Sequence, residues 1–238
     1  MYLNGNQVYS LGSDTDRENP FDTLSWTEIG EICNAGNAPD YFKVGDRVTI
    51  NYSNTIVPTV EYVVVGINEK LCDKDSVHGL ILQATGRPLT DVWASYSTNY
   101  SDSNVKGDTG VIYNYAPDDL KAVMSDATFY YHTSTSAKSD AVSTMTSKTF
   151  VLSAWEMCEH SKLYLPDDDR LSSMNNANVL SYYQNPNNPI VIPTGAWTRD
   201  RRYRYASYYG MYATSGWSYS SYTSSASVNP CFCIGTVV

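Results

Sequence analysis

Residues 199–227 read RDRRYRYASYYGMYATSGWSYSSYTSSAS, and fifteen of these twenty-nine residues are Tyr or Ser. Tyr provides a large contact area with few rotatable bonds, Ser and Gly provide adaptable polar contacts, and Arg and Trp make strong single anchors. This is the composition of a recognition surface. We therefore expect residues 1–198 and 228–238 to form a scaffold that holds this stretch, called here the Tyr/Ser-rich segment, out toward a ligand.

The tyrosines of the Tyr/Ser-rich segment are expected to form much of the binding surface. Seven tyrosines in so short a polar stretch cannot all be buried, because each buried phenol needs a hydrogen-bond partner. Together with the arginines they can stack on sugar rings, pair with carboxylates or phosphates of cell-wall polymers, or bind a protein. The predicted ligand contacts are Arg199, Asp200, Arg201, Arg202, Tyr203, Arg204, Tyr205, Ser207, Tyr208, Tyr209, Tyr212, Tyr219 and Tyr222.

The same composition has a structural alternative, in which the tyrosines pack on their own scaffold. Some rings must do so, and we expect Trp197 and Trp217 to be buried framework residues whose indole N–H groups donate hydrogen bonds. Four of the sixteen basic residues lie within 199–204. The alternative interpretation of that basic run is an exposed, solvated turn.

The overall composition describes a folded protein that is not a general nucleic-acid binder. Hydrophobic residues make up 42% and charged residues 17% of the 238 residues, which is typical of a folded domain. The net charge of −9 disfavours contacts with a phosphate backbone, which need a basic face. The N-terminus MYLNGNQVYS has no charged-then-apolar signal pattern, and no run of about twenty apolar residues occurs. We therefore expect neither signal-directed export nor membrane insertion.

The cysteines predict buried thiols rather than a metal centre. The five cysteines do not combine with the three histidines in a zinc-binding spacing. We expect free thiols in a protein made in a reducing cytoplasm, with no required metal or cofactor. Cys231 and Cys233 would share one face of a strand, so a joint metal site is an alternative. Residues 166–169 and 185–188 offer oxygen ligands for calcium, but their turn-forming composition favours plain loops.

The first part of the chain predicts a short helix followed by a meander of strands. Ser25 and Glu28 have the spacing of a capping box, which opens a helix, and Gly36 suits the end of a helix. We therefore expect a short helix that begins at this capping box and ends at Gly36. The alternating or β-branched runs that follow are typical of antiparallel strands. Strands are expected at 47–51, 60–67 and 79–83.

The middle of the chain, residues 86–147, is expected to be its least regular part. One helical segment is predicted over 118–124, and the tract 133–148, rich in Ser, Thr and Ala, is predicted to be an exposed loop. No internal repeat or domain linker interrupts the chain. We expect a connecting segment over 1–21 and a single α+β domain over 22–238.

The end of the chain predicts further short elements around the Tyr/Ser-rich segment. A strand over 149–152 leads into a second capping box, Ser153 and Glu156, which opens a short helix. A short apolar strand is also expected at 189–193, and residues 228–238 are expected to form an apolar strand pair broken by Pro230 and Gly235.

Three blocks of the sequence stand out together: SWTEIGEICNAG with PDYFKVGD (25–46), TFVLSAWE (149–156), and GAWTRD with VNPCFCIG (195–235). In this order they resemble a family of uncharacterised domains in phage and prophage tail-associated proteins of gut Gram-positive bacteria. Members carry a W-x-R-[SD] motif, a variable segment and an [RN]-P-[AC]-F-like closing strand, similar to Trp197-Thr198-Arg199-Asp200 and Asn229-Pro230-Cys231-Phe232 here. Asn229 stands where the family usually has Arg.

This resemblance implies a fold and a function. Similar domains belong to the C-type-lectin-like and formylglycine-generating-enzyme-like group, with short twisted antiparallel strands, two or three short helices and much irregular loop. The implied function is receptor binding by a phage tail protein of the virion, made in the bacterial cytoplasm, with a host cell-surface protein or glycan as partner. The alternative is a tail or capsid decoration protein whose Tyr-rich face packs on another virion protein.

A catalytic role is the least favoured interpretation. Formylglycine-generating relatives use two cysteines at a copper site, which directs attention to Cys231 and Cys233. The segment VNPCFCIG, however, reads as an ordinary apolar closing strand. No Ser-His-Asp or paired-carboxylate pattern is apparent, so we expect no enzymatic activity.

The Tyr/Ser-rich segment also resembles the variable region of diversity-generating retroelement targets. In these variable proteins of phages and bacteria, adenine-directed mutagenesis of AAC-type codons yields residues such as Tyr, Ser, Asn, Asp, Gly and Arg, but not Lys, Glu, Gln, Met or Trp. Residues 199–227 contain no Lys, Glu or Gln. On this resemblance, Met211 and Trp217 would be fixed framework positions.

Overall fold

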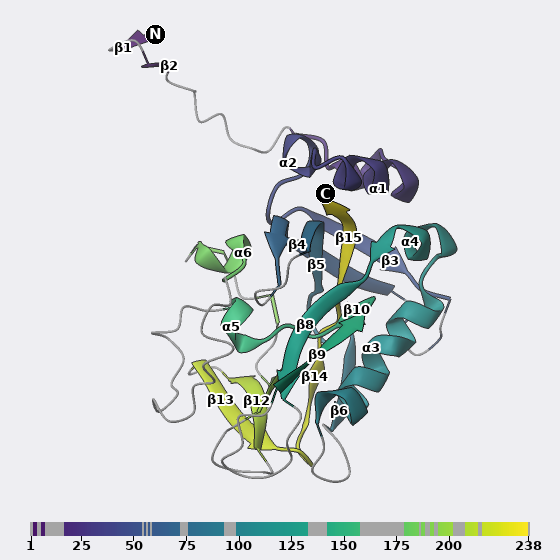
Figure 1. The fold of residues 1–238 in the computed structure, drawn as a ribbon, viewed down its shortest axis with the longest axis vertical. Coiled ribbons are helices and arrows are strands. Elements are labelled where there is room, and N and C mark those ends of the chain that lie inside the picture. The colour runs from purple at the N-terminus through teal and green to yellow at the C-terminus, as the bar shows by residue number, and fades with distance from the viewer. Residues whose placement is uncertain are drawn as a thin grey trace.

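The computed structural model describes residues 2–3, 6–7, 17–53, 55, 57, 59–71, 76–92, 99–132, 142–157, 179–185, 187–188, 191–192, 195–201, 208–213 and 216–237. Within this set, the backbone alone is described for residues 2–3, 6–7, 92, 132, 142, 201, 208–213 and 216–220. The architecture is mixed α+β with mostly antiparallel strands and few helices, as predicted (Figure 1). No helix in these ranges is both long and apolar enough to cross a membrane.

A central six-stranded antiparallel sheet forms the middle of the fold. The predicted meander is present as three consecutive neighbours, and the closing strand β15 inserts between β5 and the short strands β7 and β10. The strands are β3 (Arg47–Asn51), β4 (Thr59–Lys70), β5 (Val77–Ala84), β7 (Met124–Ser125), β10 (Thr149–Phe150) and β15 (Cys231–Val237).

A second sheet contains the ordered strands of the Tyr/Ser-rich segment. Its order is β13-β12-β11-β14-β6, and only the β11–β14 pair is parallel. The strands are β6 (Leu89–Val92), β11 (Ala196–Arg201), β12 (Tyr208–Ala213), β13 (Gly216–Ser221) and β14 (Ser225–Val228). Figure 1 shows the β12–β13 hairpin at the end of the molecule opposite α1 and α2.

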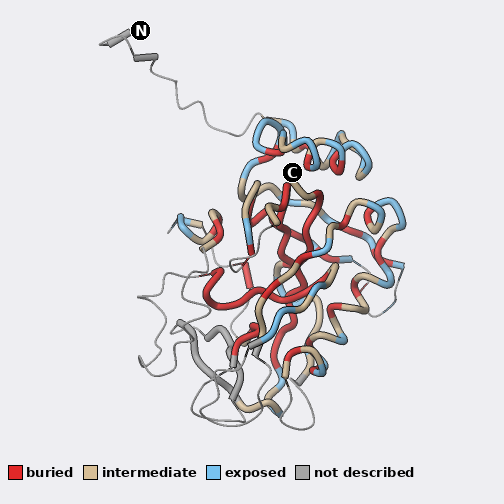
Figure 2. Tube along the Cα trace, in the orientation of Figure 1, coloured by how far each residue is buried: buried red, intermediate tan, exposed pale blue. Residues whose placement is uncertain are grey.

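Two apolar cores lie on the two sides of the central sheet. Alternation along β15 sends Cys231 and Cys233 into one core and Phe232 and Ile234 into the other. The first core also holds Trp197 and residues of the second sheet, so we call it the anchor-side core. The second lies beneath helices α1, α2 and α4, and we call it the helix-side core. Figure 2 shows buried residues along the central sheet and exposed ones on the outer side of α1.

The sequence predicts some of the helices and not others. Helix α1 begins after the predicted capping box, in which Ser25 and Glu28 bond reciprocally, and the predicted helix 118–124 corresponds to α4. The longest described helix, α3, was not expected, because its two glycines and four β-branched residues weaken the helical pattern. The remaining helices are short. The bounds are η2 (Pro20–Asp22), α1 (Trp26–Asn34), α2 (Ala38–Tyr41), η3 (Tyr100–Asp102), α3 (Asn104–Tyr115), α4 (Asp118–Val123), α5 (Ala154–Met157) and α6 (Ser181–Gln184).

Helix α1 approaches the central sheet closely because two glycines face it. A Cβ atom added to Gly79 on β5 would lie 2.4 Å from the Cys33 Cβ, and one added to Gly235 on β15 would lie 2.5 Å from it. Gly235 also has a φ of +66°, which favours glycine. Gly235 does not interrupt β15, contrary to the expectation that it would break the closing strand.

Two predicted irregular or strand regions differ in the structure. Residues 142–147 form β9 (Val142–Ser147), paired with β8 (Ala127–His132), so the loop predicted over 133–148 is wrong in its second part. The Ser/Thr-rich composition suggested a loop, but β-branched Thr and Val suit a paired strand. Val191 and Ile192 are buried but belong to no strand, contrary to the strand predicted over 189–193.

The folded unit includes part of the predicted connecting segment. Arg17 forms an ion pair with Asp46, and the Phe21 ring packs on Phe42 at a centroid distance of 5.0 Å. Residues from Arg17 onward therefore belong with the domain predicted to begin at residue 22. Nearer the N-terminus, β1 (Tyr2–Leu3) pairs with β2 (Asn6–Gln7).

Candidate functional site

The Tyr/Ser-rich segment contributes an antiparallel hairpin to one side of the second sheet. Strands β12 and β13 pair without a register shift from Tyr208↔Ser221 to Ala213↔Gly216, and β13 is the outermost strand. Four predicted contacts lie on these strands: Tyr208, Tyr209, Tyr212 and Tyr219. Tyr222, in the turn after β13, is half-buried and packs against the anchor-side core. Arg202, Tyr203, Arg204, Tyr205 and Ser207 lie outside the described residues.

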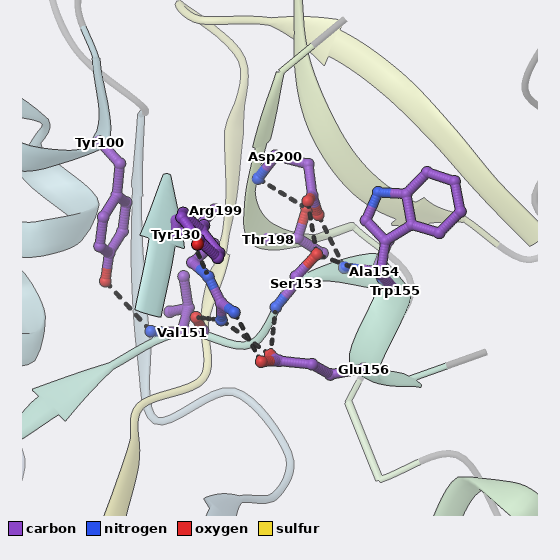
Figure 3. Close-up of polar contacts among 10 residues, drawn as sticks. All are labelled: Tyr100, Tyr130, Val151, Ser153, Ala154, Trp155, Glu156, Thr198, Arg199 and Asp200. Carbon is purple, nitrogen blue, oxygen red and sulfur yellow. Dashed lines mark hydrogen bonds and ion pairs between the residues drawn. The ribbon is translucent and has the colours of Figure 1, made fainter. Parts of the chain in front are cut away.

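Arg199 lies inside the protein. Its side chain is 1% exposed and is held by Glu156, which is 0% exposed, through Nη1–Oε2 and Nη2–Oε1 contacts of 2.8 and 2.6 Å (Figure 3). Arg199 also donates from Nε to the Tyr130 carbonyl and from Nη1 to the Val151 carbonyl. Its guanidinium carbon lies 4.9 Å from the centroid of the Phe129 ring. The bonding capacity of this guanidinium is directed inward.

Asp200 is also buried, with 5% exposure, and it holds the start of α5. One carboxylate oxygen accepts a hydrogen bond from the Ser153 hydroxyl at 2.6 Å, and the other accepts one from the Ala154 N–H at 2.7 Å (Figure 3). Burial raises the pKa of Asp200, and its hydrogen bonds oppose that rise. The predicted ligand contacts Arg199 and Asp200 are therefore reassigned to the framework, because their polar atoms bond within the protein.

A bulge in β11 turns these two side chains toward α5. The register pairs Trp197 with Met211, and the next pair along the two strands joins Arg201 with Tyr209. Two residues are traversed on β12 while four are traversed on β11, so β11 has two extra residues at this point. A bulge of this kind bends a strand and redirects its side chains. The W-x-R-D motif thus forms the bent entrance to the Tyr/Ser-rich segment.

Trp197 meets the expectation for a framework tryptophan. It is 2% exposed, and its Nε1 donates to the Asp91 carbonyl at 3.0 Å. Its register partner is Met211, the other predicted fixed position beside Trp217, and the structure describes Met211 by its backbone alone. The side chain of Trp217, the other predicted framework tryptophan, is not among those described.

The exit from the Tyr/Ser-rich segment is held by Asn229. Its Nδ2 donates to the carbonyls of Ala84 and Gly86 at 3.0 and 2.9 Å, and its Oδ1 accepts from the Ser227 hydroxyl at 2.9 Å. Asn229 is buried, so these bonds satisfy polar atoms that water does not reach. The segment therefore begins and ends at buried side chains that bond to other parts of the fold.

Sequence reasoning identified the anchoring residues but not their roles. Ser153 and Glu156 were predicted as a capping box, and the Ser153 N–H does donate to Glu156 Oε2 at 2.9 Å. The pairing of Glu156 with Arg199 was missed, because the two residues are 43 positions apart. The sequence signal that could have indicated this pairing was the presence of both the SAWE block and the WTRD block, which the structure brings into direct contact.

The paired cysteines have the character of core residues. Cys231 and Cys233 share one face of β15, as predicted, and both are completely buried free thiols. Burial raises the pKa of each thiol well above its usual value, which disfavours the thiolate that metals and nucleophilic chemistry require. In the part of the chain that the structure covers, no three His, Cys, Asp or Glu side chains are grouped to hold a metal ion.

The other loop predictions concern residues 166–169 and 185–188. The first range lies outside the described residues. In the second, Asn188 Nδ2 donates to the Tyr182 carbonyl and the Asn187 N–H donates to Asn185 Oδ1, as in an ordinary polar turn.

Comparisons with family models, curated proteins and solved structures found no match to this chain.

Proposed function

We propose that the Tyr/Ser-rich segment is the ligand-binding surface of a receptor-binding protein. One observation carries this proposal: both ends of the segment are fixed by buried side chains, Arg199 and Asp200 at the entrance and Asn229 at the exit. A surface rich in Tyr, Ser and Arg binds more tightly when its ends are held in place, because the segment then loses less conformational entropy when it binds a ligand. The ligand contacts in this proposal begin after Asp200.

The proposed fold is C-type-lectin-like. This rests on the resemblance of three sequence blocks, two of which the structure joins through the contacts of Glu156 with Arg199 and of Ser153 with Asp200. It also fits a recognition segment inserted between β11 and β14, beside a central antiparallel sheet. Fold resemblance does not by itself specify a ligand, so the function rests on the composition and anchoring of the segment.

The biological setting that we propose is a phage tail, with a protein or glycan of a host surface as the ligand. The resemblance to phage and prophage tail-associated domains supports the setting. The absence of Lys, Glu and Gln from residues 199–227 supports diversification of the segment by a retroelement. The arginines and tyrosines suit anionic or sugar-containing surface polymers.

The first test removes four tyrosines together: Tyr203→Ser, Tyr205→Ser, Tyr208→Ser and Tyr209→Ser. We expect the melting temperature to change little and binding of the fluorescently labelled protein to a panel of Gram-positive bacterial cells to be lost. The matched control replaces the exposed Tyr41 and Tyr115, which lie outside the segment, with Ser and should retain cell binding. A collapse of the melting temperature in the quadruple variant would show that these tyrosines are structural.

A second measurement separates a host-binding protein from a virion subunit. Labelled wild-type protein is offered in parallel to bacterial cells and to purified phage particles. Binding to cells that the four Tyr→Ser changes abolish supports the proposal. Binding only to particles, lost in the same variant, would instead assign the Tyr-rich surface to assembly.

The diversification proposal has a genetic test. The DNA flanking the gene is sequenced in search of a reverse transcriptase and a near-copy of the region coding for residues 199–235. We expect the two copies to differ at adenines in the copy, within codons for the Tyr/Ser-rich segment. A flanking region without these elements would leave a binding surface of fixed sequence.

A further inference from the structure

In the described part of the chain, one edge of the β8–β9 hairpin has no pairing strand. Within the described ranges, β8 is the only strand that pairs with β9. Ser143, Thr144 and Thr146 of β9 are exposed, and Met145 is half-buried. The other strand, β8, lies against the core. Its Phe129 is completely buried, and its Tyr130 carbonyl accepts a hydrogen bond from Arg199.

The bond to Arg199 determines which backbone groups of β9 face outward. In an antiparallel ladder the N–H and C=O of one residue point to the same side, and pairs that exchange hydrogen bonds alternate with pairs that do not. The Tyr130 carbonyl points away from β9, so Tyr130 and its partner Thr144 form a non-hydrogen-bonded pair. The N–H and C=O of Thr144 therefore point away from β8.

A second contact agrees with this assignment. Thr128 and Thr146 are also register partners, two residues along from Tyr130 and Thr144, and their hydroxyl oxygens lie 2.9 Å apart. Side chains come closest in non-hydrogen-bonded pairs. By the same alternation, the backbone groups of Val142, Thr144 and Thr146 form the outward-facing row of β9.

The sequence of β9 offers none of the usual protection of an edge strand. Natural edges are shielded by charged side chains, proline, bulges or covering elements. Strand β9 reads VSTMTS, with no charged residue and no proline, and its pairing with β8 has no register shift. By contrast, the edge strand β3 carries Arg47, which forms an exposed ion pair with Glu61 of β4.

We propose that β9 pairs antiparallel with β9 of a second copy of this chain. In a two-fold arrangement Thr144 lies opposite Thr144, and Val142 lies opposite Thr146, so the outward-facing backbone groups of both strands match. No charges meet across this contact. Elsewhere a net charge of −9 on each copy opposes self-association, which makes the uncharged strand the favourable place for it.

The dimer is expected to be weak and reversible. A single pair of six-residue strands buries less surface than a standard protein interface, and we expect a Kd weaker than roughly 1 µM. Even so, two copies would present two Tyr/Ser-rich segments, and bivalent attachment strengthens binding to a repetitive surface without any new contact.

The test compares self-association of the wild type with that of Thr144→Lys, by sedimentation equilibrium over a concentration series. We expect a concentration-dependent dimer for the wild type and a monomer for Thr144→Lys, which places two like charges opposite each other. The control Thr49→Lys adds the same charge at an exposed position of the β3 edge and should dimerise like the wild type. A wild type that stays monomeric at about 1 mM, roughly a thousand times the concentration that corresponds to a Kd of 1 µM, overturns the proposal.

Hydrogen exchange locates the contact independently of any variant. The Ser143 and Met145 N–H groups bond within the hairpin and should be protected at every protein concentration. The Thr144 and Thr146 N–H groups should gain protection only as concentration rises. A dimer in which these two amides continue to exchange rapidly would overturn the assignment to β9, as would dimerisation that survives in Thr144→Lys.

Discussion

The two ends of the molecule are held together by different kinds of contact. At the α1 end, Cys33 sits against Gly79 and Gly235, and the contact is one of shape between apolar surfaces. At the base of the Tyr/Ser-rich segment, Glu156 and Arg199 form a fully buried, bidentate ion pair. Apolar packing is not directional, whereas a bidentate pair fixes both distance and angle. The polar anchors therefore specify where the segment starts, whatever residues follow.

The largest effect should come from breaking the polar anchor. Replacing Glu156 by Ala leaves the Arg199 guanidinium buried without its carboxylate, and we expect a loss of about 3–5 kcal/mol in the free energy of unfolding. Urea denaturation followed by circular dichroism measures it. The control Glu31→Ala, at an exposed position of α1, should change stability by less than about 0.5 kcal/mol.

A double replacement sharpens that result. Glu156→Leu combined with Arg199→Met removes both charges and keeps apolar bulk, so most of the lost stability should return. Recovery of stability together with loss of cell binding would show that the ion pair positions the segment. Equal destabilisation by the single and double variants would contradict this account.

A smaller effect is expected at the apolar end. Gly79→Ala introduces a Cβ that would lie 2.4 Å from the Cys33 Cβ, so α1 must shift away from the sheet. Overpacking of this kind costs about 1–3 kcal/mol, measured by the same denaturation experiment. Cys33→Ala keeps the Cβ in place and should not relieve the strain. A neutral Gly79→Ala would mean that α1 is free to move outward.

The smallest effect concerns a half-buried carboxyl group beside the second sheet. Burial, and secondarily the charge of Asp91, raise the pKa of Asp108 to about 6. Because the pKa of Asp108 is higher in the folded state than in the unfolded state, the folded state binds this proton more tightly. The contribution of Asp108 to the free energy of unfolding is therefore greatest below about pH 4 and is lost as the pH rises through about 6. Asp108→Asn should therefore raise the melting temperature at pH 8, by at most about 2–4 °C because the group is screened, and have little effect at pH 4. A lower melting temperature at pH 8 would contradict this sign.

The sequence predicts those parts of the fold whose causes are local. The Ser25 and Glu28 capping box, the β-branched strand meander and the two-residue alternation of Cys231 and Cys233 depend on near neighbours, and all three are present. The burial of Arg199 could not be predicted in this way. A charged residue is buried only when a distant part of the chain supplies its partner, here Glu156 and the carbonyls of β8 and Val151.

The same reasoning explains the errors in the middle of the chain. Strand β9 has the composition of a loop and becomes a strand because β8 pairs with it. Helix α3 has a weak apolar pattern because Val105 and Ile112 are the apolar residues on its buried face and the polar Thr109 lies between them. For the candidate site, composition alone indicated recognition, but the limits of the segment required knowledge of which neighbouring residues are buried.

The alternation along β15 has a consequence for unfolding. Cys231 and Cys233 belong to the anchor-side core, and Phe232 and Ile234 belong to the helix-side core. Strand β15 also pairs with β5, so Cys231 lies opposite Gln83, a residue far from it in the sequence. Detaching this strand would open both cores at once. The two halves therefore cannot melt separately, and the protein should unfold in a single cooperative transition, with the β15 amides exchanging only when the whole molecule unfolds.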